Sequence, residues 1–241
     1  MTSVAIYSVG GAPGVSTLVA AMAATSTNDR PLLVVEAAPG GGVVAARWGW
    51  PASDESIVTA AMDTTGVAGL AGVAREWMSG SRVVVGHPSP EATMHAQVGM
   101  WVADRLADVA VPVVVDGGRL AGSMDQVRLA ETVDVRWVLI DPTADQVTTA
   151  HALVQSMARR TGQVGLLCRE PSGPGRYPVD EAAAAIGWPL VATIPHDPAA
   201  AETMCGRSPV GRALRRSQLL RAAAALASQL HDAVEVSDVA V

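Results

Sequence analysis

Short apolar runs alternate with longer alanine-rich segments along the whole chain. The runs are rich in Val, Leu and Ile and are bounded by turn residues, a pattern typical of strands buried on both faces of a parallel sheet. The longer segments have the length and the Ala and Leu content of helices. We predict strands at 4–9, 32–36, 82–86, 112–116, 135–140, 163–168 and 189–194, and helices at 16–27, 54–79, 91–108, 123–133, 143–160, 179–186 and 209–231.

Strands that alternate with helices from end to end predict a doubly wound α/β fold. We expect a mostly parallel sheet of about seven strands with helices on both faces. Neither a repeat nor a linker divides the chain, so residues 1–231 should form a single domain, followed by a flexible tail at 232–241. Ligands of such folds bind where the strands end, which directs attention to residues 10–17, 36–42, 87–90, 116–122, 141–142 and 168–170.

The segment between the first predicted strand and the first predicted helix is rich in glycine. A turn of this kind places backbone N–H groups around an anion at the start of a helix. We therefore predict that the loop holds the phosphates of a nucleotide, with the Ser16 hydroxyl on Mg²⁺. A tight turn that binds nothing is the alternative. The predicted cofactor-binding residues are Gly10, Gly11, Ala12, Pro13, Gly14, Val15, Ser16 and Thr17.

This loop, the next strand and the later segments, over about residues 1–230, resemble the MinD/ParA family of P-loop ATPases. The loop of that family reads Gly-Lys-Gly-Gly-x-Gly-Lys-Thr-Thr. In the resemblance, its signature lysine, which reaches across a nucleotide-sandwich dimer, falls on Gly10, and its phosphate-binding lysine falls on Val15. Ser16 and Thr17 keep the two hydroxyls, so the loop resembles a degenerate Walker A motif.

This chain has only some of the acidic residues that the family carries at the ends of its strands. Its second strand ends Asp-x-Asp-Pro, whereas this chain reads EAAP at 36–39, so the carboxylate that positions the attacking water falls on Ala38. We interpret Glu36 as a loop cap. Asp116 falls on the metal-linked Walker B aspartate, and the resemblance implies Ser16 and Asp116 as the ancestral Mg²⁺ positions. Capping of the following turn is the alternative role for Asp116.

The chain contains no lysine, and all 17 of its basic residues are arginine. Drift toward arginine would account for missing surface lysines, but it would leave arginine rather than valine at position 15. Each lost charge-assisted contact to phosphate weakens binding by about 1.5–3 kcal/mol, and catalysis in this class depends on positioning and electrostatics. We therefore expect a pseudo-ATPase with hydrolysis absent or very slow, and either no cofactor or weakly bound ATP or ADP with Mg²⁺.

Two arginines follow the predicted ligand loops and are candidates to replace the missing lysine charge. These are Arg47, after the 37–42 loop, and Arg119, after Asp116. Each either approaches the phosphates or lies in solvent as a surface residue. The sequence leaves both interpretations open.

Four segments, GAPGVST, VVEAAPGGGVVAARWG, VVVDGGRL and IPHDPAAAE, further resemble an actinobacterial branch related to CpaE/TadZ-type proteins, which localise pilus or secretion machines. The resemblance implies a localisation or scaffold protein, with a homodimer as one form. It would act through protein partners such as a secretion or pilus ATPase or membrane components. One alternative is an atypical active ATPase of DNA partitioning or cell-division positioning. Another is a nucleotide-independent, DNA-associated regulator.

The net charge of −6 argues against strong DNA binding. Arginines near the C-terminus allow weak DNA contact or, on a basic amphipathic helix, contact with an anionic membrane, while a closing helix packed on the sheet is the third interpretation of that segment. The residues concerned are Arg212, Arg215, Arg216 and Arg221. The N-terminus reads as a strand and no apolar run is long enough to cross a membrane. We expect a cytoplasmic protein that reaches the membrane or the cell pole only through partners.

The remaining residues with potential chemistry show no recognisable site pattern. Cys168 and Cys205 and the five histidines lack metal-ligand spacing. We interpret His87 as a loop histidine. We interpret His196 and Asp197 as part of a proline-flanked turn, and contact with a nucleotide base is the alternative. Trp48 and Trp50 follow the 37–47 loop and serve either as partner anchors or as core residues; the four other tryptophans are scattered.

Overall fold

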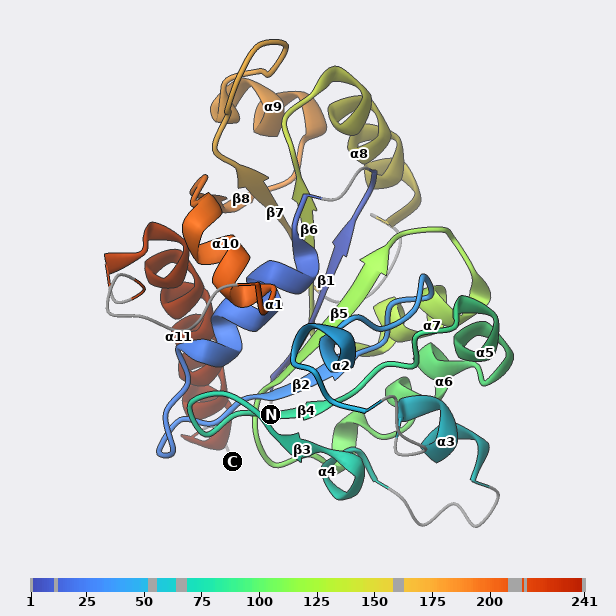
Figure 1. Cartoon of the computed structure of the whole chain (residues 1–241). Helices are drawn as coiled ribbons and strands as arrows, with labels where there is room; N and C mark the ends of the chain where they lie inside the picture. The colour runs from blue at the N-terminus through green and yellow to red at the C-terminus, as the bar shows by residue number, and fades with distance from the viewer. Residues whose placement is uncertain are drawn as a thin grey trace.

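The computed structural model describes residues 2–10, 13–51, 56–63, 69–157, 163–207, 214 and 216–239. Within these residues one eight-stranded sheet runs through the molecule in the order β3-β4-β2-β5-β1-β6-β7-β8 (Figure 1). All neighbouring strands are parallel except the short edge pair β3 and β4. The strands are β1 Ser3–Ser8, β2 Leu33–Glu36, β3 Arg75–Glu76, β4 Arg82–Val84, β5 Val113–Arg119, β6 Val135–Ile140, β7 Gln163–Arg169 and β8 Leu190–Ile194.

Helices cover both faces of the sheet, as Figure 1 shows. The helices are α1 Val15–Ala24, α2 Val44–Arg47, α3 Ile57–Met62, α4 Leu70–Val73, α5 Pro90–His95, α6 Val98–Ala103, α7 Met124–Thr132, α8 Ala144–Met157, α9 Val179–Ile186, α10 Pro198–Met204 and α11 Gln218–Val239, with a short 3-10 turn η1 at Leu106–Asp108.

Alternation along β1 explains the two layers. Val4 and Ile6 point into an apolar cluster with α1, α10 and α11, whereas Ala5 and Tyr7 point into a second cluster on the other side, with α3, α4, α6 and α7. Successive side chains of a strand face opposite sides of the sheet, so a strand buried on both faces is apolar throughout. A third apolar cluster joins α8 and α9 to β6 and β7. The predicted doubly wound fold is therefore confirmed.

The seven predicted strands all occur, and the two-residue β3 is an addition. The single helix predicted over 54–79 is wrong, because its described residues hold α3, α4 and β3. Gly69 precedes α4 in an extended conformation, and glycine favours such interruptions over a continuous helix. The helix predicted over 91–108 is also interrupted, where Gln97 takes a left-handed conformation with φ of 50° between α5 and α6.

The C-terminal half contains two further differences. The sequence did not predict α10, and α11 continues to Val239 rather than ending at 231. Leu219, Ala223, Leu226 and Leu230 of α11 are buried at helical spacing in the cluster that contains α1. This agrees with a closing helix packed on the sheet. Whether residues 232–241 are flexible stays a prediction.

The carboxyl ends of the parallel strands meet at one edge of the sheet. β1 lies at its centre, between β5 and β6, which places the β1–α1 loop at the point where the connections change direction. Ligands of open α/β sheets bind at such a point. Among the helices in the described part of the chain, none is both long and apolar enough to cross a membrane.

Candidate functional site

The β1–α1 loop leads directly from the centre of the sheet into α1. Gly14 stands at the N-cap of α1 with φ of 104°, a conformation that glycine adopts without steric cost. Its carbonyl oxygen accepts the first helical hydrogen bond, from the Leu18 N–H at 2.8 Å. Of the predicted binding residues, Gly11 and Ala12 lie outside the described residues. A Cβ at Gly10 would meet Gln146 Cγ at 3.8 Å, an ordinary van der Waals contact, so the position has room for a Cβ atom.

Three consecutive residues at the start of α1 point in different directions. Val15, at the position of the phosphate-binding lysine, is buried within the apolar cluster under the helix. Ser16 is half-buried, and its side chain lies close enough to the carboxylate of Asp116 to lower the pKa of that group. Thr17 is half-buried, and its hydroxyl lies 3.5 Å from Cys205 Sγ. The structure thus brings Ser16 and Asp116 together and leaves position 15 without charge.

Asp116 is a buried carboxylate at the end of β5. Burial raises its pKa above the usual range, while hydrogen bonds from Ser16 and from the Gly118 N–H, at 3.0 Å, and the nearby charge of Arg47 oppose that shift. A hydroxyl and a carboxylate are oxygen ligands of the type that Mg²⁺ prefers. The pair therefore fits the metal implied by the resemblance. The capping interpretation also holds, because Asp116 accepts from Gly118.

Asp116→Asn is expected to stabilise the protein at neutral pH. Because the folded-state pKa is raised, the folded protein binds more protons than the unfolded chain at intermediate pH, so stability falls as the pH rises through this window. Asparagine removes the buried charge and keeps an acceptor for Gly118. We expect Tm at pH 7 to rise by roughly 2–4 °C, about 1 kcal/mol for a domain of this size.

Thermal unfolding followed by circular dichroism from pH 3 to 8 measures this effect. The gain should vanish below the ordinary aspartate pKa of about 3.9, where the carboxyl is protonated in both states. Asp104→Asn, at an exposed residue paired with Arg128 at 3.5 Å, is the matched control and should show no such profile. A lower Tm for Asp116→Asn at pH 7 would mean that its hydrogen bonds outweigh the burial cost.

Glu36 holds the loop between β2 and α2. Its buried carboxylate accepts three backbone N–H groups, from Val43 at 2.5 Å, Val44 at 3.1 Å and Gly86 at 2.9 Å. Burial raises its pKa, and the backbone hydrogen bond from Val43 is the largest effect in the other direction. The interpretation of Glu36 as a loop cap agrees with these contacts. It fixes the start of α2, the helix that ends at Arg47.

A cavity of about 330 Å³ opens beside the start of α1. One part of its wall comes from the β1–α1 loop and α1, another from the ends of β7 and β8, and the rest from α10, the segment after it, and α11. Its charged and hydrogen-bonding side chains include Thr17, Arg169, His196, Asp197, Glu202, Cys205 and Arg207. Its size lies at the lower end of small-molecule pockets.

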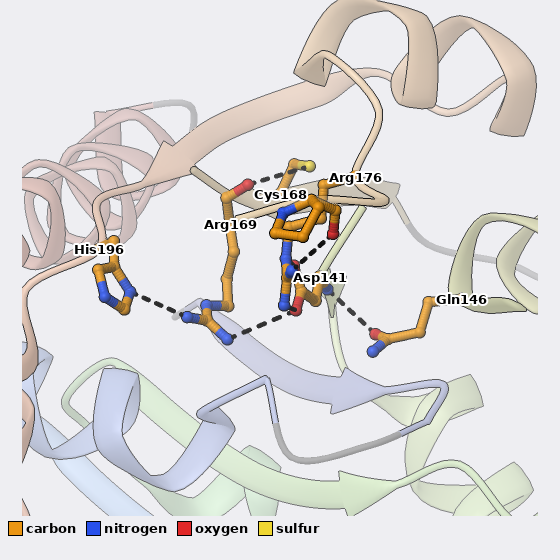
Figure 2. Close-up of polar contacts among 7 residues, drawn as sticks. Asp141, Gln146, Cys168, Arg169, Arg176 and His196 are labelled. Carbon is orange, nitrogen blue, oxygen red and sulfur yellow. Dashed lines mark hydrogen bonds and ion pairs between the residues drawn. The ribbon is translucent and has the colours of Figure 1, made fainter. Parts of the chain in front are cut away.

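Arg169, at the end of β7, is held in place by its neighbours. Figure 2 shows its guanidinium between His196 and Asp141. Nη2 lies 3.2 Å from His196 Nδ1, and Nη1 lies 3.8 Å from Asp141 Oδ2. Asp141 is bound more closely by Arg176, whose Nε and Nη2 each donate at 2.8 Å. One carboxylate therefore faces two guanidinium groups.

Asp197 accepts hydrogen bonds from the starts of two helices beside the cavity. Its carboxylate accepts from the Ala200 N–H at 3.1 Å, the Ser217 hydroxyl at 2.7 Å and the Gln218 N–H at 3.1 Å. Burial opposes ionisation, but these hydrogen bonds, led by that from Ser217, leave its pKa below the usual range. Asp197 thus joins the N-termini of α10 and α11. Asp197 is the N-cap of α10 rather than part of a turn, and both His196 and Asp197 line the cavity.

Several other predicted residues have structural roles. The ring of His87 accepts the Ser89 N–H at 3.0 Å, which agrees with a loop histidine. Trp48 packs edge-on against Trp77 with ring centroids 5.3 Å apart, and it and Trp50 border the cluster that contains α1. Arg119 is exposed. Arg212 and Arg215 lie outside the described residues, and Arg216 and Arg221 are exposed.

The sequence analysis missed the basic residues of the cavity. Arg169 lies in the 168–170 segment that follows a predicted strand, but no motif distinguishes it there. Arg207 follows α10, which was not predicted. The one available signal was Asp197-Pro198, since an N-cap residue followed by proline is a common start of a helix.

No protein-family profile matches this sequence, and no curated protein sequence matches it. Solved structures do match. The cell division ATPase MinD of Pyrococcus furiosus is 17% identical, with a TM-score of 0.78 over 96% of this chain and 98% of that one. The septum site-determining protein MinD of Pyrococcus horikoshii, complexed with Mg-ADP, is 16% identical, with a TM-score of 0.78 over 98% of both chains.

A ParA family ATPase from Chlorobium tepidum is 16% identical, with a TM-score of 0.75 over 95% of this chain and 99% of that one. These similarities extend over nearly the whole length of each protein. The chain therefore has the fold of the MinD and ParA P-loop ATPases.

Proposed function

We propose that this chain is a MinD/ParA-type protein that binds an adenine nucleotide weakly, hydrolyses it very slowly or not at all, and works by positioning protein partners. The observation that carries the proposal is the contrast between positions 15 and 16. Ser16 and Asp116 still lie beside each other, whereas Val15 is buried among apolar side chains where a P-loop ATPase has its phosphate-binding lysine.

The loss of charge affects hydrolysis more than binding. Backbone N–H groups of a P-loop still contribute to phosphate binding when the lysine is absent. Phosphoryl transfer, however, depends on cations that neutralise charge as it develops and on a residue that orients the attacking water. Positions 10, 15 and 38 carry glycine, valine and alanine, so none supplies those groups.

The nucleotide would lie with its base and ribose in the cavity and its phosphates at the β1–α1 loop. Gly14 and Thr17 form part of the cavity wall, which makes the two regions continuous. Ser16 and Asp116 would hold Mg²⁺, which when bound neutralises phosphate charge. The MinD of Pyrococcus horikoshii, complexed with Mg-ADP, supports a ligand of this class for the same fold.

Calorimetry with Mg·ADP and Mg·ATP tests the proposal. We expect a Kd near 100 μM, about −5.5 kcal/mol, and ATP turnover below about 10⁻³ s⁻¹, the range of unassisted P-loop enzymes. Ser16→Ala should weaken Mg²⁺-dependent binding at least fivefold. Thr25→Ala, at the far end of α1, should leave it unchanged. Turnover near 1 s⁻¹ that Ser16→Ala abolishes would instead establish an active ATPase.

A protein that does not hydrolyse its nucleotide must act through what it binds. A solved MinC:MinD cell division protein complex from Aquifex aeolicus has this fold, which supports protein partners as a class. The resemblance to CpaE/TadZ-type proteins favours the machinery of a pilus or secretion system, with the protein as a scaffold, alone or as a homodimer. Capture of such an ATPase from cells, lost when the loop 37–47 is altered, would support this assignment.

A further inference from the structure

We propose that the side chain of Gln126 holds the loop after β5 in a single conformation, so that this loop presents the same surface with or without a bound ligand. The loop covers residues 117–122 and follows Asp116 directly. The inference rests on the proposed function, because the loop packs against the 37–47 segment, where we place partner binding. A partner would then be bound regardless of whether the ligand loop is filled.

The amide of Gln126 binds three backbone groups of the loop at once. Its Oε1 accepts the Ala121 N–H at 2.8 Å, and its Nε2 donates to the carbonyl oxygens of Gly117 at 3.2 Å and Arg119 at 2.8 Å. The side chain is 3% exposed. Both amide hydrogens and the amide oxygen are therefore used inside the protein. Movement of the loop would leave buried polar groups without partners, which strongly disfavours it.

Helix α7 fixes the place of Gln126. Ser123 is the N-cap of α7, and its hydroxyl accepts the Gln126 N–H at 3.3 Å. The carboxylate of Asp125 accepts the N–H groups of Gly99 at 2.9 Å and Met100 at 2.6 Å, which ties the start of α7 to the start of α6. The loop is therefore fastened to a packed pair of helices, and it cannot carry Gln126 along without displacing them.

The first part of the loop continues β5 along β1. Gly118 pairs with Tyr7, and the Leu120 N–H donates to the carbonyl oxygen of Ser8 at 2.8 Å. Gly117 lies so close to the ring of Tyr7 that a Cβ would overlap it. These contacts hold the side of the loop that faces β1, whereas Gln126 holds its backbone from α7.

Gly118 also joins this loop to the 37–42 loop. Its φ is 63°, and a Cβ at this position would lie only 2.7 Å from Ala38 Cβ. The Ala37 N–H donates to the carbonyl oxygen of Asp116 at 3.0 Å. Glycine at 118 and a small side chain at 38 therefore let the two loops pack directly on each other. A change of conformation in one loop would require a change in the other.

Amide hydrogen exchange followed by NMR tests the inference, without ligand and with about 1 mM Mg·ADP, roughly ten times the expected Kd. In the unaltered protein the amides of Leu120 and Ala121 should exchange about a thousandfold more slowly than in an unstructured chain, and Mg·ADP should change these rates by less than about threefold. Gln126→Met keeps an unbranched side chain of similar length but removes the amide. It should speed both amides at least about tenfold.

Gln146→Met is the matched control. Gln146 is a second buried glutamine, and its Oε1 accepts the Asp141 N–H at 3.0 Å; among the described residues it makes no hydrogen bond to the 117–122 loop. This variant should leave the exchange of Leu120 and Ala121 unchanged. Circular dichroism establishes whether both variants are folded. The rates of the unaltered protein need no substitution, so they test the inference even if Gln126→Met does not fold.

The outcomes of the inference and of the proposed function can be told apart. Fast exchange of Leu120 and Ala121 in the ligand-free protein, or equal rates in folded Gln126→Met, overturns the inference. Mg·ADP that binds and slows these amides about tenfold or more also overturns it and leaves the proposed function intact. If calorimetry shows no binding of Mg·ADP, the nucleotide part of the proposed function fails, and the ligand-free rates with those of Gln126→Met decide the inference.

Discussion

Replacing Glu36 with alanine is expected to lower the free energy of unfolding by about 3–5 kcal/mol. The carboxylate is the acceptor for three backbone N–H groups, those of Val43, Val44 and Gly86. A buried donor left without a partner costs about 1–3 kcal/mol. Relief of the burial cost that raises the Glu36 pKa offsets part of the loss. Chemical denaturation at pH 7 measures the difference through the midpoint and slope.

Glu36→Gln is the matched control. It has nearly the same shape and keeps one carbonyl oxygen, so one or two of the three N–H groups retain an acceptor. We expect a loss of about 1–2 kcal/mol, smaller than that of Glu36→Ala. Equal stability of the alanine variant and the unaltered protein would show that water replaces the carboxylate, and that Glu36 does not hold the loop before α2.

Gly206→Ala should destabilise the protein by about 2–5 kcal/mol. Gly206 has φ of 70°, where a side chain costs about 1–2 kcal/mol. The added Cβ would also overlap the carbonyl oxygen of Arg47, with the carbonyl carbon at 2.8 Å. No rotamer relieves a clash with backbone, so either α2 or the segment after α10 must move, at a further cost of about 1–3 kcal/mol.

Gly187→Ala isolates the two contributions. Gly187, at the end of α9, has φ of 83° but nothing within 4 Å of the position that a Cβ would occupy. It should therefore lose only the conformational part, about 1–2 kcal/mol. Similar losses for the two variants in the same unfolding experiment would contradict the overlap argument, because they would mean that α2 yields without cost.

The strand pattern was predictable because buried parallel strands are continuously apolar, and the run VVV at 113–115 shows this directly. The boundaries of the short elements within 54–79 could not be predicted, because short apolar stretches with glycine are compatible with both helix and loop. β3, at the edge of the sheet, has only two residues and therefore no periodicity to detect.

The closeness of Ser16 and Asp116 was predictable from the resemblance, and the structure places the two side chains beside each other. The contacts of Arg169 and Arg176 with Asp141 could not be predicted from the sequence. Arg176 lies in a loop rich in proline and glycine, 35 residues after its partner Asp141, and neither residue belongs to a motif. Contacts of this kind depend on where β6 and β7 end relative to each other, which only the folded sheet determines.

The central place of β1 has a consequence for synthesis of the protein. Ser3 pairs with Val113 and Val4 with Val135, so the first strand to leave the ribosome finds its first neighbour only after nearly half of the chain exists, and its second only after more than half. At about 5–20 residues per second, synthesis as far as the first neighbour takes roughly 6–23 s. During that time the strand that precedes the β1–α1 loop stays unpaired, which makes the nascent chain a natural client for chaperones.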